Sequence, residues 1–95
     1  MIITVNGGSM VPTIVKGDRV HIRQAKCPVA VGQVVLCKDT YGKHMIHRVV
    51  AVTPAIVTRG DALESDDAPI DKVLGIVTRV EKTWISRLRR FTLRL

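Results

Sequence analysis

Short runs of β-branched and aliphatic residues, separated by turn-forming residues, recur along most of this 95-residue chain. Valine and isoleucine favour strands over helices because their branched Cβ restricts χ1. Glycine, proline and aspartate between the runs supply the conformations that turns need. The runs that we expect to be strands cover residues 2–5, 18–24, 33–39, 44–53, 55–59 and 73–80. The pattern predicts an all-β fold of short, mostly antiparallel strands that form a sheet or, as we favour, a small partly open barrel.

The composition limits the chain to one modest domain. It is 46% hydrophobic but only 3% aromatic, so the core must be built from aliphatic side chains. Ninety-five residues are enough for one such core. The longest apolar runs, such as residues 34–37, fall far short of the roughly 18 residues that a spanning helix needs. No charged start followed by an apolar signal-peptide segment is present either. We therefore expect a protein that is cytoplasmic or peripheral on the membrane.

The end of the chain differs from the rest in charge and in pattern. Of the net charge of +7, residues 1–78 contribute +2 and residues 79–95 contribute +5. We therefore divide the chain into a core, residues 1–80, and a tail, residues 81–95. In the tail, apolar side chains recur at helical spacing with arginines on the other faces, which predicts a short amphipathic helix. The apolar positions are Trp84, Ile85, Leu88, Phe91 and Leu95.

The expected helix has two kinds of partner. Its apolar face could pack on its own domain or on a partner subunit. Alternatively, residues 84–95 could lie in the plane of an anionic membrane, with tryptophan and arginine at the level of the headgroups. Because the excess charge lies in the tail, the composition argues against nucleic-acid binding by the whole domain. The oligomeric state is left open.

One serine lies on a loop with the features of a nucleophile turn. Ser9 follows Gly7 and Gly8, and Pro12 stands three residues later. Gly8 would let the backbone turn sharply and keep the hydroxyl exposed. A serine in such a place can also simply cap a turn. Because a serine hydroxyl is a poor nucleophile by itself, the catalytic hypothesis requires a base elsewhere in the chain.

His47 is the expected base, because histidine titrates near neutral pH. Strand alternation puts His47 and Met45 on one face and His44 on the other. Lys43, a further candidate, lies in the expected hairpin loop, and His21 lies in a different strand. The residues themselves leave these alternatives open.

A histidine base needs an acceptor on its other ring nitrogen. Asp61, Asp66 and Asp67 provide three candidates in an acidic stretch, residues 61–71, that is too long for a tight turn. The same acids could form a solvated loop, and Arg48 could pair with one of them in a purely structural contact.

Five segments of the chain also form a familiar order. They are Ser-Met-Val-Pro at 9–12, Gly-Asp at 17–18, Ile-His-Arg-Val at 46–49, Thr-Arg-Gly-Asp at 58–61 with Asp-Asp at 66–67, and Val-Leu-Gly-Ile-Val at 73–77. This order resembles the type I signal peptidase family, in particular its histidine-using branch from the endoplasmic reticulum, archaea and some bacilli. That family is related to LexA-like peptidase domains.

The resemblance implies a LexA/signal peptidase-like core and a serine endopeptidase that cleaves a leader or precursor peptide. Ser9 would be the nucleophile and His47 the base. Asp67, six residues after Asp61, matches the acid of the histidine branch, and Asp61 would shape the loop behind it. The expected substrate has small side chains at the first and third positions before the cut. The resemblance places three residues beside the substrate: Gly8, Met10 and Pro12.

Two features differ from the family pattern. Gly7 stands where many members carry a hydroxyl residue that helps the oxyanion hole, so we expect slow turnover. The N-terminal membrane anchor of the family's enzymes does not precede Ser9 in this sequence. A catalytically silent peptide-binding module is therefore one alternative function. A LexA-like self-cleaving domain is another, although that family has lysine at the position of His47.

Cys27 and Cys37 are the only cysteines, and their spacing is not that of a metal site. We expect both to be buried or partly buried free thiols. No metal or other cofactor is expected.

Overall fold

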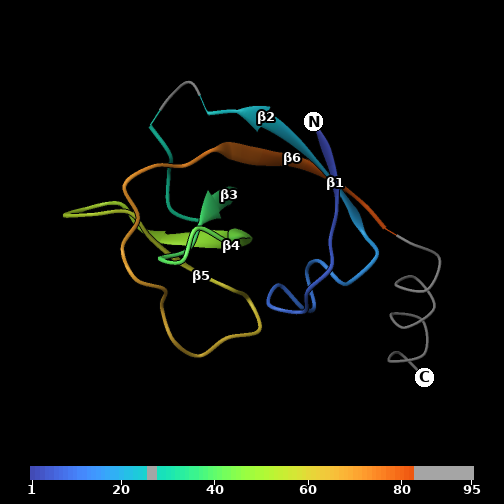
Figure 1. The fold of residues 1–95 in the computed structure, drawn as a ribbon, viewed down its shortest axis with the longest axis horizontal. Helices are drawn as coiled ribbons and strands as arrows, with labels where there is room; N and C mark the ends of the chain where they lie inside the picture. Colours follow the sequence, from blue (N-terminus) through green and yellow to red (C-terminus); the bar gives the residue numbers. More distant parts are fainter. Residues whose placement is uncertain (26–27, 83–95) are drawn as a thin grey trace.

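The computed structural model describes residues 1–25 and 28–82, and these form one six-stranded antiparallel sheet. The strands are β1 (Ile2–Thr4), β2 (Arg19–Gln24), β3 (Val34–Lys38), β4 (His44–Ala51), β5 (Val57–Arg59) and β6 (Gly75–Glu81). Their order across the sheet is β1-β2-β6-β3-β4-β5 (Figure 1). The last described strand, β6, therefore lies inside the sheet, with β1 and β2 on one side and β3, β4 and β5 on the other.

The all-β, antiparallel prediction is confirmed, and each expected run contains one strand. The ends differ by a few residues: β4 stops at Ala51, and β6 begins at Gly75. The sheet is open, with β1 and β5 as edge strands that do not pair with each other in the described part of the chain. The closure of a partly open barrel is thus not seen. The predicted C-terminal helix and Cys27 lie outside the described residues.

Both faces of the sheet carry apolar side chains. One cluster contains Met10 and Ile14 of the β1–β2 connection, packed on buried residues of β2 and β3. The other contains Val35, Cys37 and Val49, together with Ile76 of β6. Cys37 is a free, fully buried thiol, as expected for that cysteine. Loops therefore cover both faces, and the loop over the first face carries Ser9.

A hairpin joins β3 to β4 at the place where the sequence predicts one. The Asp39 carboxylate accepts hydrogen bonds from the Tyr41 and Lys43 N–H groups, each at 2.9 Å. Gly42 has a φ of +81°, a conformation that L side chains rarely adopt. This turn fixes the register in which Val35 lies opposite His47.

The loop between β1 and β2, residues 5–18, is fastened at both ends. The Val5 N–H donates to the Asp18 carbonyl, and the Gly17 N–H donates to the Val5 carbonyl, each at 2.8 Å. The fully buried Asp18 carboxylate accepts from the Val15 N–H and from the Lys82 ammonium, both at 3.0 Å. Lys82, just after β6, therefore ties this loop to the central strand. No helix within the described residues is long and apolar enough to cross a membrane.

Candidate functional site

Ser9 and His47, 38 positions apart in the sequence, are in hydrogen-bond contact. The Ser9 Oγ lies 2.9 Å from the His47 Nε2. His47 is held in the middle of β4, opposite Val35, and only 6% of it is exposed. Ser9 lies in a turn closed by the Val11 N–H donating to the Gly8 carbonyl at 3.2 Å. A rigid strand therefore holds the imidazole, and a fastened loop brings the hydroxyl to it.

Asp67 occupies the other side of the ring. Its Oδ2 lies 2.5 Å from the His47 Nδ1 and also accepts a hydrogen bond from the Thr58 hydroxyl at 2.7 Å. An ionised carboxylate can only accept, so Nδ1 carries the proton that joins the ring to Asp67. Nε2 of the neutral ring is then an acceptor for the Ser9 hydroxyl. This is the arrangement in which an imidazole can take the proton of a serine.

The turn after β5 fits directly against Ser9. The Ala62 N–H donates to the Ser9 carbonyl at 2.8 Å, and Figure 1 shows this turn, in yellow, beside the blue loop that carries Ser9. A Cβ on Gly60 would lie 2.5 Å from the Ser9 carbonyl oxygen and 3.0 Å from the Ser9 Cβ. Only glycine permits this approach, because the nearest obstacle is backbone.

Gly8 does not have the role that the sequence predicts for it. Its φ is not positive, and a Cβ there would meet only Val11, at 3.9 Å. The sharp turn at Ser9 therefore does not depend on Gly8, and the essential close contact is at Gly60. The Gly60-Asp61 pair was visible as a turn signal in the sequence, but its partner across the fold was not.

Asp61 does not contact His47. Its carboxylate accepts two hydrogen bonds from Arg48, at 2.8 and 2.9 Å, and one from Thr13 at 2.6 Å. The hydrogen bonds from Arg48, followed by that from Thr13, hold the pKa of Asp61 below its ordinary value. Its N–H also donates to the Met10 sulfur at 3.4 Å. Asp61 thus joins β4 to the Ser9 loop, in line with the loop-shaping role and the structural pairing with Arg48.

The remaining acidic and basic candidates lie away from the Ser9–His47 contact. Asp66 is exposed and forms a long ion pair with Arg59, at 3.6 Å. His44 is exposed, and the register places it on the face opposite His47. Lys43 is exposed in the hairpin loop, as expected.

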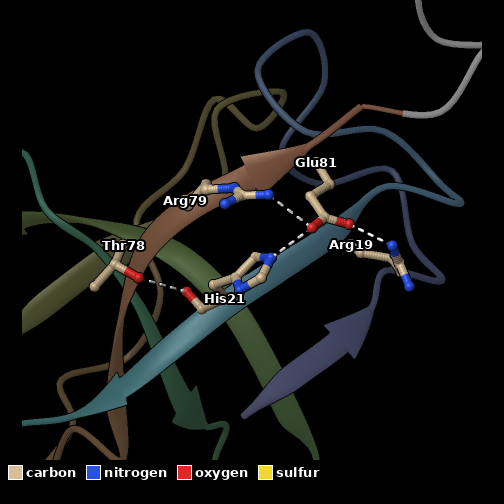
Figure 2. Close-up of polar contacts among 5 residues, drawn as sticks. All are labelled: Arg19, His21, Thr78, Arg79 and Glu81. Carbon is tan, nitrogen blue, oxygen red and sulfur yellow. Dashed lines mark hydrogen bonds and ion pairs between the residues drawn. The ribbon is translucent and has the colours of Figure 1, made fainter.

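His21 has a carboxylate partner of its own on β2 and β6. Its Nε2 lies 2.8 Å from Glu81, which also accepts from Arg19 at 2.5 Å and from Arg79 at 2.9 Å (Figure 2). No serine hydroxyl takes part in this cluster. His21 therefore belongs to a half-buried polar cluster and has no serine partner there.

A cleft of about 610 Å³ opens in front of Ser9, His47 and Asp67. One wall is formed by residues 3–10, the other by the start of β4, and Leu63 lies at its edge. Gly8 and Met10 line it, as predicted, but Pro12 is exposed in the turn and is not among the lining residues. Much of the lining is apolar, and we call this part of it the aliphatic wall. It includes Ile3, Val5, Met10, Ile14, Leu36 and Ile46.

Thr58, like Gly60, has a role in the site that sequence reasoning missed. It is fully buried and holds Asp67 by two contacts: its hydroxyl donates to the carboxylate, and its carbonyl accepts from the Asp67 N–H at 2.8 Å. The available signal was a polar residue at the inward position of an apolar strand. In residues 1–25 and 28–82, no group of three or more His, Cys, Asp or Glu side chains is arranged to hold a metal ion.

Comparisons with protein-family models, curated proteins and solved structures find no match to this chain.

Proposed function

We propose that this protein is a serine endopeptidase of the signal peptidase type, acting through Ser9 and His47 with the assistance of Asp67. The observation that carries the proposal is the continuous chain of contacts from the Ser9 hydroxyl through both ring nitrogens to a carboxylate, at 2.9 and 2.5 Å. This chain opens into a cleft, so a peptide carbonyl can reach the hydroxyl. The resemblance of the sequence to the histidine-using branch supports the same assignment.

In the proposed reaction, the Ser9 Oγ attacks the scissile carbonyl while His47 Nε2 takes the hydroxyl proton. The imidazolium that forms is stabilised by Asp67. His47 then gives the proton to the amine of the leaving peptide, which leaves Ser9 acylated. A water molecule, activated by the same nitrogen, hydrolyses the ester and restores the hydroxyl. No metal or cofactor is needed for these steps.

The substrate is proposed to bind as an extended strand. Pairing of β4 with β5 covers residues 48–51, so residues 44–47 have a strand neighbour only on the β3 side within the described sheet. Across the cleft, β1 pairs only with β2. A peptide between these two free edges could bond to both with its backbone, which leaves the cleft walls to select side chains. The aliphatic wall favours apolar side chains, and the preference for small ones is what the resemblance implies.

The oxyanion would be stabilised by the Ser9 N–H, since Gly7 offers no hydroxyl. A Cβ at Gly7 would meet no atom within 4 Å, so the space beside it is open. Removing one such donor typically costs on the order of 10²–10³ in rate. We therefore expect a slow enzyme.

Hydrolysis of a peptide panel with small residues at the first and third positions before the cut tests the proposal. We expect cleavage by the wild type and none by Ser9→Ala. Ser65→Ala, an exposed serine in the loop after β5, is the matched control and should cleave as the wild type does. If the wild type binds these peptides but cleaves none, the chain is the silent peptide-binding module instead.

Adding anionic vesicles to the same assay tests the proposed membrane contact of residues 84–95, which lie outside the described part of the structure. Faster cleavage of a lipid-anchored peptide, with loss of the gain at high salt, would support that contact.

A further inference from the structure

Thr58 contacts Asp67, the acid of the site, at two points. Its hydroxyl donates to the Asp67 Oδ2 at 2.7 Å, and its carbonyl accepts from the Asp67 N–H at 2.8 Å. Thr58 is 0% exposed and lies on β5, opposite the buried Val49. Because water cannot reach the hydroxyl from outside, its hydrogen bond to Asp67 faces no competing solvent.

We propose that Thr58 is a positioning residue, whose hydroxyl sets both the orientation and the effective charge of Asp67 and thereby the protonation of His47. This rests on the proposed function. The same oxygen of Asp67 receives the Thr58 hydroxyl and the His47 Nδ1, the latter at 2.5 Å. Two donors on one oxygen restrain rotation of the carboxylate about its Cβ–Cγ bond.

The second consequence is electrostatic. A hydrogen bond to a carboxylate draws off part of the negative charge that it presents to its other partner. With Thr58 in place, Asp67 stabilises the imidazolium form of His47 less strongly. The Nε2 lone pair of the ring is then more readily kept free for the Ser9 proton.

The Thr58 hydroxyl has a second neighbour, the Cys37 thiol on β3. Burial, followed by the charge of Asp67, raises the pKa of that thiol to about 11, while a hydrogen bond with Thr58 acts in the opposite direction. The thiol is therefore neutral near pH 7 and leaves the negative charge of this contact on Asp67. On the loop and β5, Asp66 is paired with Arg59. The charged groups that face the cleft from the hairpin are Asp39, Lys43 and His44.

Thr58→Val and Thr58→Ser separate the role of the hydroxyl from that of the shape. Valine keeps the volume and removes the donor, whereas serine keeps the donor. For Thr58→Val we expect kcat to fall on the order of tenfold with little change in KM, and the acid limb of the kcat/KM profile to move to higher pH. Thr58→Ser should recover both. A Thr58→Val enzyme with the wild-type rate and profile, or a Thr58→Ser enzyme as impaired as Thr58→Val, would overturn the proposal.

A measurement that needs no catalysis distinguishes this proposal from the proposed function. NMR titration of the His47 ring should give a midpoint at higher pH in Thr58→Val and a wild-type midpoint in Thr58→Ser. If that shift appears in a protein that cleaves no peptide, Thr58 acts as proposed and only the endopeptidase assignment fails. If the midpoint does not move, the positioning role fails, whatever the activity.

If Thr58→Val does not fold, Thr58→Ala takes its place, because alanine also removes the hydroxyl donor. The wild type gives a further check without any substitution. The Thr58 hydroxyl proton should exchange slowly and show a nuclear Overhauser contact with the His47 Nδ1 proton. A rapidly exchanging hydroxyl would contradict the proposal.

Discussion

Two histidine–carboxylate pairs lie among the described residues, and only one of them has a serine hydroxyl on the second ring nitrogen. The side chains of His47 and Asp67 are 7% and 20% exposed, whereas those of His21 and Glu81 are 27% and 25% exposed (Figure 2). The second nitrogen of His47 meets a serine hydroxyl in a cleft. His21, on β2, has no such partner among the described residues. The pair alone therefore does not define the site.

The arginines of the two regions sharpen the contrast. Arg19 and Arg79 bond to the same carboxylate as His21, so the charge of Glu81 is shared among three donors. Beside His47, by contrast, Arg48 bonds to a separate carboxylate, Asp61. Asp67 has no guanidinium partner among the described residues, so its charge is shared only between the imidazole and the Thr58 hydroxyl.

Neutralising Asp67 and Glu81 in turn is the strongest test of whether the two histidine–carboxylate pairs differ in function. In Asp67→Asn the amide can hold the ring in the wrong tautomer, so we expect kcat to fall by roughly 10⁴. Glu81→Gln, the matched change at the other pair, should leave kcat within about twofold. Peptide hydrolysis under saturating substrate measures both. Equal losses in the two variants would show that the two pairs do not differ in kind.

Gly60→Ala should give the next largest effect. The added Cβ would lie 2.5 Å from the Ser9 carbonyl oxygen, and this backbone cannot move without displacing the nucleophile. A displacement of about 1 Å can cost roughly 10² in rate. The kcat of a variant shown to be folded by circular dichroism is the readout. Full activity would mean that the position of Ser9 tolerates such a shift.

Asp61→Asn should affect stability more than the chemical step. Because hydrogen bonds from Arg48 lower the pKa of Asp61, its stabilisation is present above the ordinary value near 3.8 and is lost as pH falls through the folded value. Since Arg48 is about one-third exposed, we expect a loss of only about 1 kcal/mol at pH 7. Urea unfolding at pH 7 and at pH 2.5 measures the difference, which should shrink at the lower pH. An equal loss of unfolding free energy at pH 7 and at pH 2.5 would contradict an origin in the Asp61–Arg48 ion pair.

Much of the fold could be predicted from the sequence because its signals are local. Alternation, turn residues and the Tyr41-Gly42 hairpin depend on neighbours in the chain, and all six strands were expected. The open edges of the sheet were not, since closure depends on contacts between β1 and β5 that no local pattern encodes. Small changes in where strands end also depend on long-range pairing.

The site divides in the same way. Ser9 and His47 could be named from the sequence, and Asp67 from the resemblance, whereas the roles of Thr58 and Gly60 could not be predicted. Both act through contacts with residues distant in the sequence: a buried hydroxyl on Asp67, and an absent side chain against Ser9. Gly8 lines the cleft as predicted but is not required for the turn at Ser9, and Pro12 does not line the cleft.

The central claim is that His47 activates the Ser9 hydroxyl, and the rate of covalent labelling by a fluorophosphonate probe tests it most directly. Mass spectrometry of the digested protein should place the adduct on Ser9, with a rate that rises with pH through the range in which histidine loses its proton. In His47→Ala the rate should fall by at least about 10³, while His21→Ala should label as the wild type does. Labelling of the wild type no faster than His47→Ala, or an adduct on another residue, would contradict the account.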